Sequence, residues 1–254
     1  MAKTRRQQRK EDDTLTARQF QGFSRETFSF LRDLGRHNDK AWFEAHRAVY
    51  EQHVLQPLRD LVSDLADFML GIDLSFEVEP AVGKAISRIF RDTRFSKDKS
   101  PFRDRMWIVF KRSDREWARY GPAYFLEITP TSYRYGLGFY DAAPDLMAQF
   151  RRQIDDDPES FLKAVAWLDK QDTFTLLGDT YKRPIGADKP EPIRTWYQYK
   201  SFYLSCDRPI DAAILSPKFA RQLAKHFALA APLYRYVRRT ASKVLGERAD
   251  RTRA

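Results

Sequence analysis

Apolar side chains recur at intervals of three and four residues through the first third of the chain, the spacing of one helix face. The pattern predicts helices over residues 25–35, 40–55 and 57–71, each opened by a polar capping residue or by a proline. Residues 72–83 change to a short alternation typical of a strand or a loop. We therefore expect helices to occupy the N-terminal part of the fold.

The middle of the chain alternates with a period of two, which is the repeat of a β-strand. This alternation predicts strands over residues 105–111, 123–128 and 133–140, and the first of them is apolar on both faces. Gly136 and Gly138 leave one face of the third strand without side chains, which predicts the close approach of another segment. The short connections favour an antiparallel meander.

Helical spacing returns over residues 146–169, where two short helices are predicted. Residues 174–183 read as a hairpin around a Gly-Asp turn, and the aromatic residues 196–205 fit either a helix or a strand. A last helix starts at residue 217, and its basic end beyond residue 235 is expected to fray. Together these elements predict an α+β fold, with N-terminal helices packed on a mostly antiparallel sheet and closed by C-terminal helices.

The 254 residues are enough for one large domain or two small ones, and no linker divides them. Residues 1–18 are polar without periodicity, which predicts a disordered basic arm. Residues 19–240 are expected to form a single α+β domain, followed by a basic tail over residues 241–254. The apolar runs are much shorter than the ~20 residues that cross a bilayer, so we expect no membrane partner.

Metal and cofactor signatures are missing from the sequence. Cys206 is the one cysteine, which excludes an intrachain disulfide and a multi-cysteine metal site and favours a reducing, cytoplasmic location. His46 and His53 share a predicted helix face, but two turns of helix separate them by about 10 Å. Gly136-Leu137-Gly138 lacks the third glycine of a dinucleotide fingerprint. We therefore expect neither a metal ion nor a cofactor.

Positive charge is concentrated in two parts of the chain. The formal net charge is +10, and residues 84–119 hold 12 basic against 5 acidic side chains. Residues 235–254 hold 7 basic against 2 acidic side chains, whereas residues 14–83 are mildly acidic. This uneven distribution predicts a basic surface that attracts an anionic partner.

The basic residues of the central stretch are the candidate anion-binding site. Arginine offers a planar pair of donors for phosphate or carboxylate, and lysine adds a compact charge. Internal pairing with the three aspartates of the same stretch is an equal alternative. The candidate residues are Arg88, Arg91, Arg94, Lys97 and Lys99. The competing carboxylates are Asp92, Asp98 and Asp104.

Aromatic residues alternate with these cations, which raises the possibility that the anionic partner is a nucleic acid. Such rings either stack on bases or belong to the core beneath the strands, and the core interpretation is the more common one. The sequence holds no helix-turn-helix, zinc finger or RNP-like motif. The aromatic residues concerned are Phe90, Phe95, Phe102, Trp117 and Tyr120.

Two further functions stay open at this point. Glu127 on a predicted strand and Asp141 after the next one are candidate acid/base groups of an enzyme. With Arg91 or Lys97 nearby, they would suit a phosphorylated or acidic small molecule. The other possibility is a scaffold that binds a protein partner, whose nature the sequence leaves unknown.

The central motif over residues 88–102 resembles a family known as a domain of unknown function, DUF2461. The resemblance extends over residues 20–235, so it covers most of the chain. Three further segments are similar to the family: residues 20–23, residues 38–43 with Tyr50 and Pro57 downstream, and residues 124–128 ahead of a glycine-rich strand.

The sequence departs from the family pattern at two positions. His37 stands where an asparagine is expected, and Phe102 stands where a tyrosine is common. The resemblance implies a single α/β domain of mostly bacterial occurrence, and it implies no activity. Any functional hypothesis must therefore come from the residues themselves.

Overall fold

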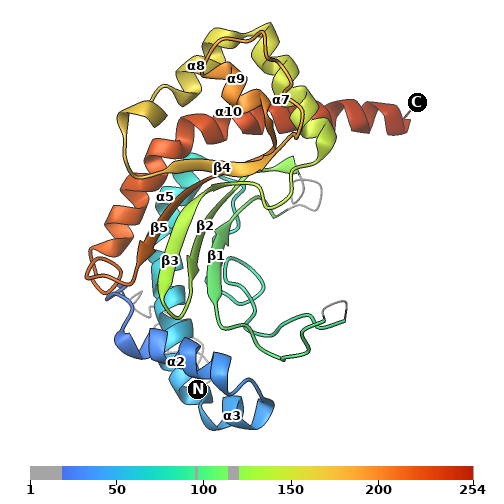
Figure 1. The fold of residues 1–254 in the computed structure, drawn as a ribbon. Helices are drawn as coiled ribbons and strands as arrows, with labels where there is room; N and C mark the ends of the chain where they lie inside the picture. Colours follow the sequence, from blue (N-terminus) through green and yellow to red (C-terminus); the bar gives the residue numbers. More distant parts are fainter. Residues whose placement is uncertain (1–18, 95–96, 114–119, 254) are drawn as a thin grey trace, which may run out of the picture.

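A five-stranded antiparallel sheet forms the centre of the protein, with the strand order β1-β2-β3-β5-β4 (Figure 1). The structure is a computed structural model that describes residues 19–94, 97–113 and 120–253. The predicted strands of the middle region are confirmed, and two more strands complete the sheet. The strands are β1 (Met106–Phe110), β2 (Ala123–Ile128), β3 (Ser132–Gly138), β4 (Thr175–Thr180) and β5 (Tyr199–Pro209).

The predicted N-terminal helices are present, but the second one is interrupted. At His46 the backbone leaves the helical region (φ −112°, ψ 12°), and the ring Nδ1 donates a hydrogen bond to the Trp42 carbonyl oxygen at 2.8 Å. In a continuous helix the Trp42 carbonyl oxygen would accept only from a backbone N–H, so the His46 side chain competes with the helical hydrogen bond at this point. The helices are α2 (Arg25–Arg36), α3 (Lys40–Ala45), α4 (Arg47–Tyr50), a π-helical turn η1 (Glu51–Leu55) and α5 (Gln56–Ile72).

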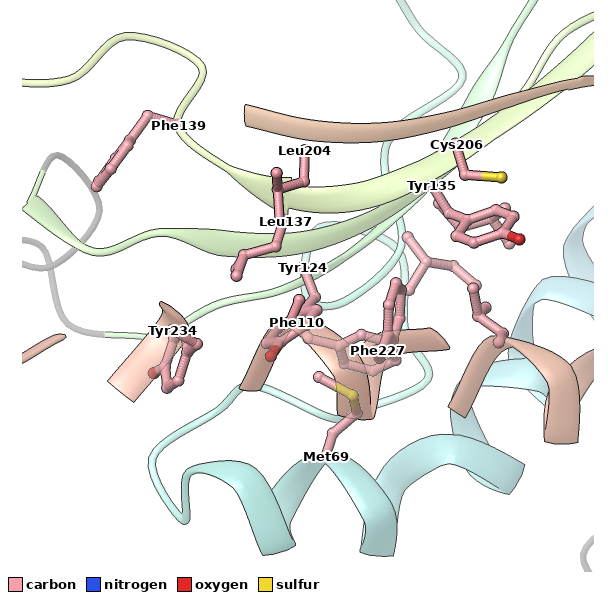
Figure 2. Close-up of a cluster of buried hydrophobic side chains, with 14 of the residues drawn as sticks. Met69, Phe110, Tyr124, Tyr135, Leu137, Phe139, Leu204, Cys206, Phe227 and Tyr234 are labelled. Carbon is pink, nitrogen blue, oxygen red and sulfur yellow. The ribbon is translucent and has the colours of Figure 1, made fainter. Parts of the chain in front are cut away.

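One face of the sheet is buried against the helices α5 and α10. Figure 2 shows side chains from the strands, among them Phe110, Tyr124 and Leu137, facing Met69 of α5 and Phe227 of α10. All five are at most 1% exposed, whereas alternate residues of β1 on the other face are only partly buried. The α+β class is therefore confirmed, with helices covering a half-buried antiparallel sheet.

The C-terminal helices close the fold, and the last of them is longer than expected. Helix α10 (Phe219–Arg253) has 35 residues and contains Pro232, so the prediction that its basic end frays is wrong. Ala241 and Val244 are buried, because the helix continues to pack on the core beyond residue 240. The other helices are α7 (Pro144–Asp156), α8 (Pro158–Val165), a 3-10 turn η2 (Leu168–Lys170) and α9 (Ile193–Tyr197).

The predicted hairpin over residues 174–183 is wrong. Its residues form the single strand β4, which pairs with β5 instead of folding back on itself. The ambiguous segment over residues 196–205 divides into the end of α9 and most of β5. Pairing with β5 is favoured because this long strand already belongs to the sheet and offers its free edge to β4.

The two glycines of β3 permit the close approach that the sequence predicts. A Cβ atom at Gly136 would lie 1.8 Å from the Leu204 carbonyl oxygen of β5. A Cβ atom at Gly138 would lie 2.4 Å from the Tyr203 Cα atom. Both contacts are far shorter than any allowed non-bonded distance, so the curved pairing of β3 with β5 requires glycine at these positions.

The predicted division of the chain into an arm, a domain and a tail stays a prediction. Residues 1–18 lie outside the described residues. In the part of the chain that is described, no helix has both the length and the apolar character needed to cross a bilayer.

Candidate functional site

The basic central stretch folds into a hairpin beside β1, which we call the basic hairpin (residues 88–105, of which 95–96 lie outside the described residues) (Figure 1). Phe90 and Phe102 face each other in an antiparallel bridge. The Arg91 N–H donates to the Pro101 carbonyl oxygen, and the Arg103 N–H donates to that of Ile89, both at 2.8 Å. These bonds fix which cations lie opposite each other.

The basic hairpin is attached to the N-terminal helices through Asn38. The Asn38 side chain accepts from the Phe102 N–H at 2.9 Å and donates to the Phe102 carbonyl oxygen at 3.0 Å. The Phe102 ring stacks on Phe43 of α3, with 4.4 Å between the ring centroids. In the sequence, Asn38 and Asp39 are both candidate caps of the helix predicted over residues 40–55. Because Asp39 is the cap that accepts from Trp42, Asn38 is available to hold the hairpin.

Each aspartate of the basic hairpin pairs with one arginine. The closest atoms of Arg94 and Asp92 are 2.7 Å apart, and those of Arg105 and Asp104 are 3.1 Å apart. The Arg94 side chain, helped by the Arg94 backbone N–H, lowers the pKa of Asp92 to about 2. Internal pairing, the alternative weighed from the sequence, therefore accounts for part of the charge. The three pairs are Arg91–Asp98, Arg94–Asp92 and Arg105–Asp104.

The other cations of the basic hairpin form no ion pair with any carboxylate that the structure describes. The Lys99 ammonium donates to the Thr93 carbonyl oxygen at 2.8 Å. Arg103 donates to the carbonyl oxygens of two hairpin residues, at 2.9 and 3.1 Å. Carbonyl oxygens accept hydrogen bonds but carry no net charge, so the surplus is not neutralised. The four cations are Arg88, Lys97, Lys99 and Arg103.

Arg91 and Arg103 lie close enough for their charges to interact. Burial lowers the pKa of Arg103 and the charge of Arg91 lowers it further, while the charge of Asp92 offsets part of this change. The Arg103 guanidinium stacks over the Trp107 ring, 4.9 Å from its centroid. Arg91 Nε is buried, and no described residue accepts a hydrogen bond from it. An anion placed between these two guanidinium groups would relieve their repulsion.

The candidate stacking residues are divided between different parts of the molecule. Phe90 is half-exposed on the basic hairpin, whereas Phe102 is buried beneath it. The hydroxyl of Tyr120 donates to Asp145 at 3.3 Å, so this ring lies beside α7 and not on the hairpin. Phe95 and Trp117 lie outside the described residues.

Glu127 lies near the basic hairpin, but arginines occupy its oxygens. Arg134 donates twice to one carboxylate oxygen, at 2.6 and 2.8 Å, and Arg105 donates to the other at 3.4 Å. Asp141 is exposed and follows β3 beyond the Gly138 end, while Glu127 pairs with Arg134 at the opposite end of that strand. The structure therefore does not bring the two candidate acid/base groups together.

A second polar cluster lies between the sheet and α10, and the sequence did not indicate it. The Tyr135 hydroxyl hydrogen-bonds with His226 Nδ1 at 2.6 Å, and Cys206 is the cross-strand neighbour of Tyr135. Burial lowers the pKa of His226. Contacts this distant in sequence leave no local motif, which is why the sequence gives no sign of this cluster. Among the described residues, no group of His, Cys, Asp or Glu side chains could hold a metal ion.

A protein-family model described as "Conserved hypothetical protein (DUF2461)" matches residues 26–236, which is most of the chain. The chain belongs to the DUF2461 family. Both the basic hairpin and the sheet lie within the matched residues of this DUF2461 protein. A search of curated proteins finds no match to it.

Proposed function

We propose that this DUF2461 protein binds a phosphate-bearing or other anionic ligand at the basic hairpin. The observation that supports the proposal is the charge surplus: four of the hairpin cations form no ion pair with a carboxylate among the described residues. Like charges that lie close together repel one another, and an anion that binds among them reduces this repulsion. The proposed anion-binding residues are Arg88, Arg91, Arg94, Lys97, Lys99 and Arg103.

The internal ion pairs are compatible with this proposal. A guanidinium group has five N–H donors, and a pair with one carboxylate uses at most two of them. Arg91 therefore keeps donors for a ligand while Asp98 holds its side chain in place. A pre-positioned guanidinium loses less conformational entropy on binding than a free one.

The experiment compares two variants with the same net charge. The hairpin variant R88Q/K97Q/K99Q/R103Q removes the four unpaired cations, and the control variant K163Q/R183Q/K218Q/R221Q removes four exposed cations from other elements. Binding to inorganic polyphosphate and to a labelled oligothymidylate is measured by fluorescence anisotropy or competition over a series of salt concentrations.

We expect the hairpin variant to bind both probes weakly and the control variant to bind them like the wild type. For the oligothymidylate, the slope of log affinity against log salt should fall in magnitude by about 3, because each phosphate contact on a single strand contributes about 0.7. Equal weakening in both variants would mean that affinity follows net charge alone. That result, or an absence of salt-sensitive binding, would overturn the proposal.

An enzymatic role for Glu127 and Asp141 has no comparable support, because the first is neutralised by two arginines and the second lies at the other end of β3. A cytoplasmic location is also proposed, on the ground that the single cysteine is buried and unpaired. Fractionation of cells with an antibody to the protein would test the location.

A further inference from the structure

Phe90 presents a half-exposed aromatic ring on the basic hairpin. Its side chain is 50% exposed, while Phe43 and Phe102 beneath it are at most 1% exposed. The Phe90 ring centroid lies 5.0 Å from that of Phe102 and 6.0 Å from that of Phe43. One side of the ring is therefore packed against a buried aromatic pair, and the other side is available to a ligand.

The backbone around Phe90 is held in place on both sides. Phe90 bridges to Phe102, and the flanking residue Arg91 donates its N–H to Pro101 at 2.8 Å. Asn38 fixes Phe102 from the other side with two hydrogen bonds. A ring that is positioned before binding loses little entropy when a second ring stacks on it.

Two cations lie next to Phe90 along the backbone of the hairpin. Arg91 follows Phe90 directly in the chain, and Arg103 donates to the Phe90 carbonyl oxygen at 3.1 Å. A simple phosphate would use the cations and leave the ring unused. Cations beside an exposed aromatic ring are the combination that binds single-stranded nucleic acid, where phosphates contact the cations and bases stack on the ring.

We propose that the anionic ligand is single-stranded nucleic acid, with an unpaired base stacked on Phe90 and the neighbouring phosphates bound by Arg91 and Arg103. This inference rests on the proposed function of the basic hairpin. A duplex presents its base edges in the grooves and keeps its base faces stacked internally, so Phe90 cannot reach them. Stacking accepts any base, so the binding is expected to tolerate changes of sequence.

The test uses Phe90→Leu, which keeps an apolar side chain but removes the aromatic face. The matched control is Tyr140→Leu, because Tyr140 is fully exposed and follows β3 at the end remote from the hairpin. The probes are a labelled oligothymidylate, a DNA duplex of the same length, and inorganic polyphosphate, which has phosphates without bases. The melting temperature of each variant verifies that it is folded.

We expect Phe90→Leu to bind the oligothymidylate roughly 5- to 150-fold more weakly, the range measured for the loss of one base–aromatic stack. Its affinity for polyphosphate should be unchanged, and Tyr140→Leu should bind all probes like the wild type. Wild-type affinity should be higher for the single strand than for the duplex.

Two results would overturn the inference and leave the proposed function standing: oligothymidylate affinity that is unchanged in Phe90→Leu, or a duplex that binds as tightly as the single strand while polyphosphate also binds. Failure of the wild type to bind any of the three probes would instead overturn the proposed function itself, and this inference with it. The polyphosphate measurement therefore separates the two failures.

Discussion

Two charged regions of this protein differ in how completely their charges are paired. Asp73, at the end of α5, is 5% exposed and accepts a hydrogen bond from the Tyr234 hydroxyl at 2.6 Å. Arg112 and Arg238 lie 3.2 and 3.6 Å from the same carboxylate, and the Ser75 N–H donates to it at 3.0 Å. In the basic hairpin, by contrast, four cations form no ion pair with a carboxylate among the described residues.

The difference follows from the solvent around each region. A buried carboxylate without partners would lose its hydration and gain nothing in return, so an interior charge persists only when it is fully paired. An exposed cation keeps its water and needs no internal partner. Stability thus requires that Asp73 be completely paired. The hairpin cations do not need internal partners for stability, so they can bind a ligand.

The largest expected effect comes from breaking the buried network. Asp73→Asn removes the charge that Arg112 and Arg238 share, and it should lower the free energy of unfolding by about 3 kcal/mol, the low end for a broken buried pair because Arg238 is partly exposed. Urea denaturation measures the change. The control Asp169→Asn, in an exposed turn, should change stability by no more than about 0.5 kcal/mol. Equal effects would remove the distinction between the two regions.

The same network predicts a dependence of stability on pH. Burial alone would raise the pKa of Asp73, but the Tyr234 hydroxyl, the Ser75 N–H and the two arginines outweigh it and lower the pKa. The contribution is therefore present above the unfolded-state pKa, about 3.9, and is lost as the pH falls through the lower folded-state value. Wild-type unfolding should show this loss at acidic pH, and a profile of the same shape in Asp73→Asn would contradict it.

An intermediate effect is expected at Glu127, which is 8% exposed but pairs with two partly exposed arginines. Glu127→Gln keeps the shape and removes the charge, so Arg105 and Arg134 lose their shared partner. We expect a loss of about 1–2 kcal/mol, the value of a charged hydrogen bond near the surface. Thermal unfolding measures this loss. A loss as large as that in Asp73→Asn would show that the burial of the ion pair does not determine how much stability its removal costs.

The hairpin variant R88Q/K97Q/K99Q/R103Q should affect stability least. Its four side chains have no ion pairs to lose, and the hydrogen bonds that Lys99 and Arg103 donate to carbonyl oxygens lie at the surface, so the unfolding free energy should stay within about 1 kcal/mol of the wild type. Urea denaturation at the salt concentration of the binding experiments measures this. A variant that unfolds readily would show that the surplus charge has a structural role.

The smallest effect is a local one at Asp92. Its pKa is lowered to about 2 mainly by the Arg94 side chain, so Arg94→Gln should move the pKa back toward its ordinary value of about 3.9. Titration of the side-chain carboxyl signal by NMR would follow the change. Lys97→Gln serves as the control, because Lys97 forms no ion pair with Asp92 and should leave this pKa near 2.

Parts of the fold and of the site could be predicted because their signals are local. Alternation over residues 105–111 and 123–140 predicted β1, β2 and β3, and two glycines predicted the close approach of another strand. The excess of cations in the hairpin was visible from composition. Such features depend on neighbours within a few residues, so the pattern of the sequence records them directly.

The sequence by itself determined the helical N-terminal region, the three central strands and the positive charge of the basic hairpin. Only the tertiary structure decided that β4 pairs with β5, that Asn38 holds Phe102, and that Asp73 meets Tyr234, 161 positions further along the chain. It also decided which arginine each aspartate neutralises. The physical reason is that helix and strand preferences act between near neighbours, whereas these pairings depend on which segments the packed core brings together.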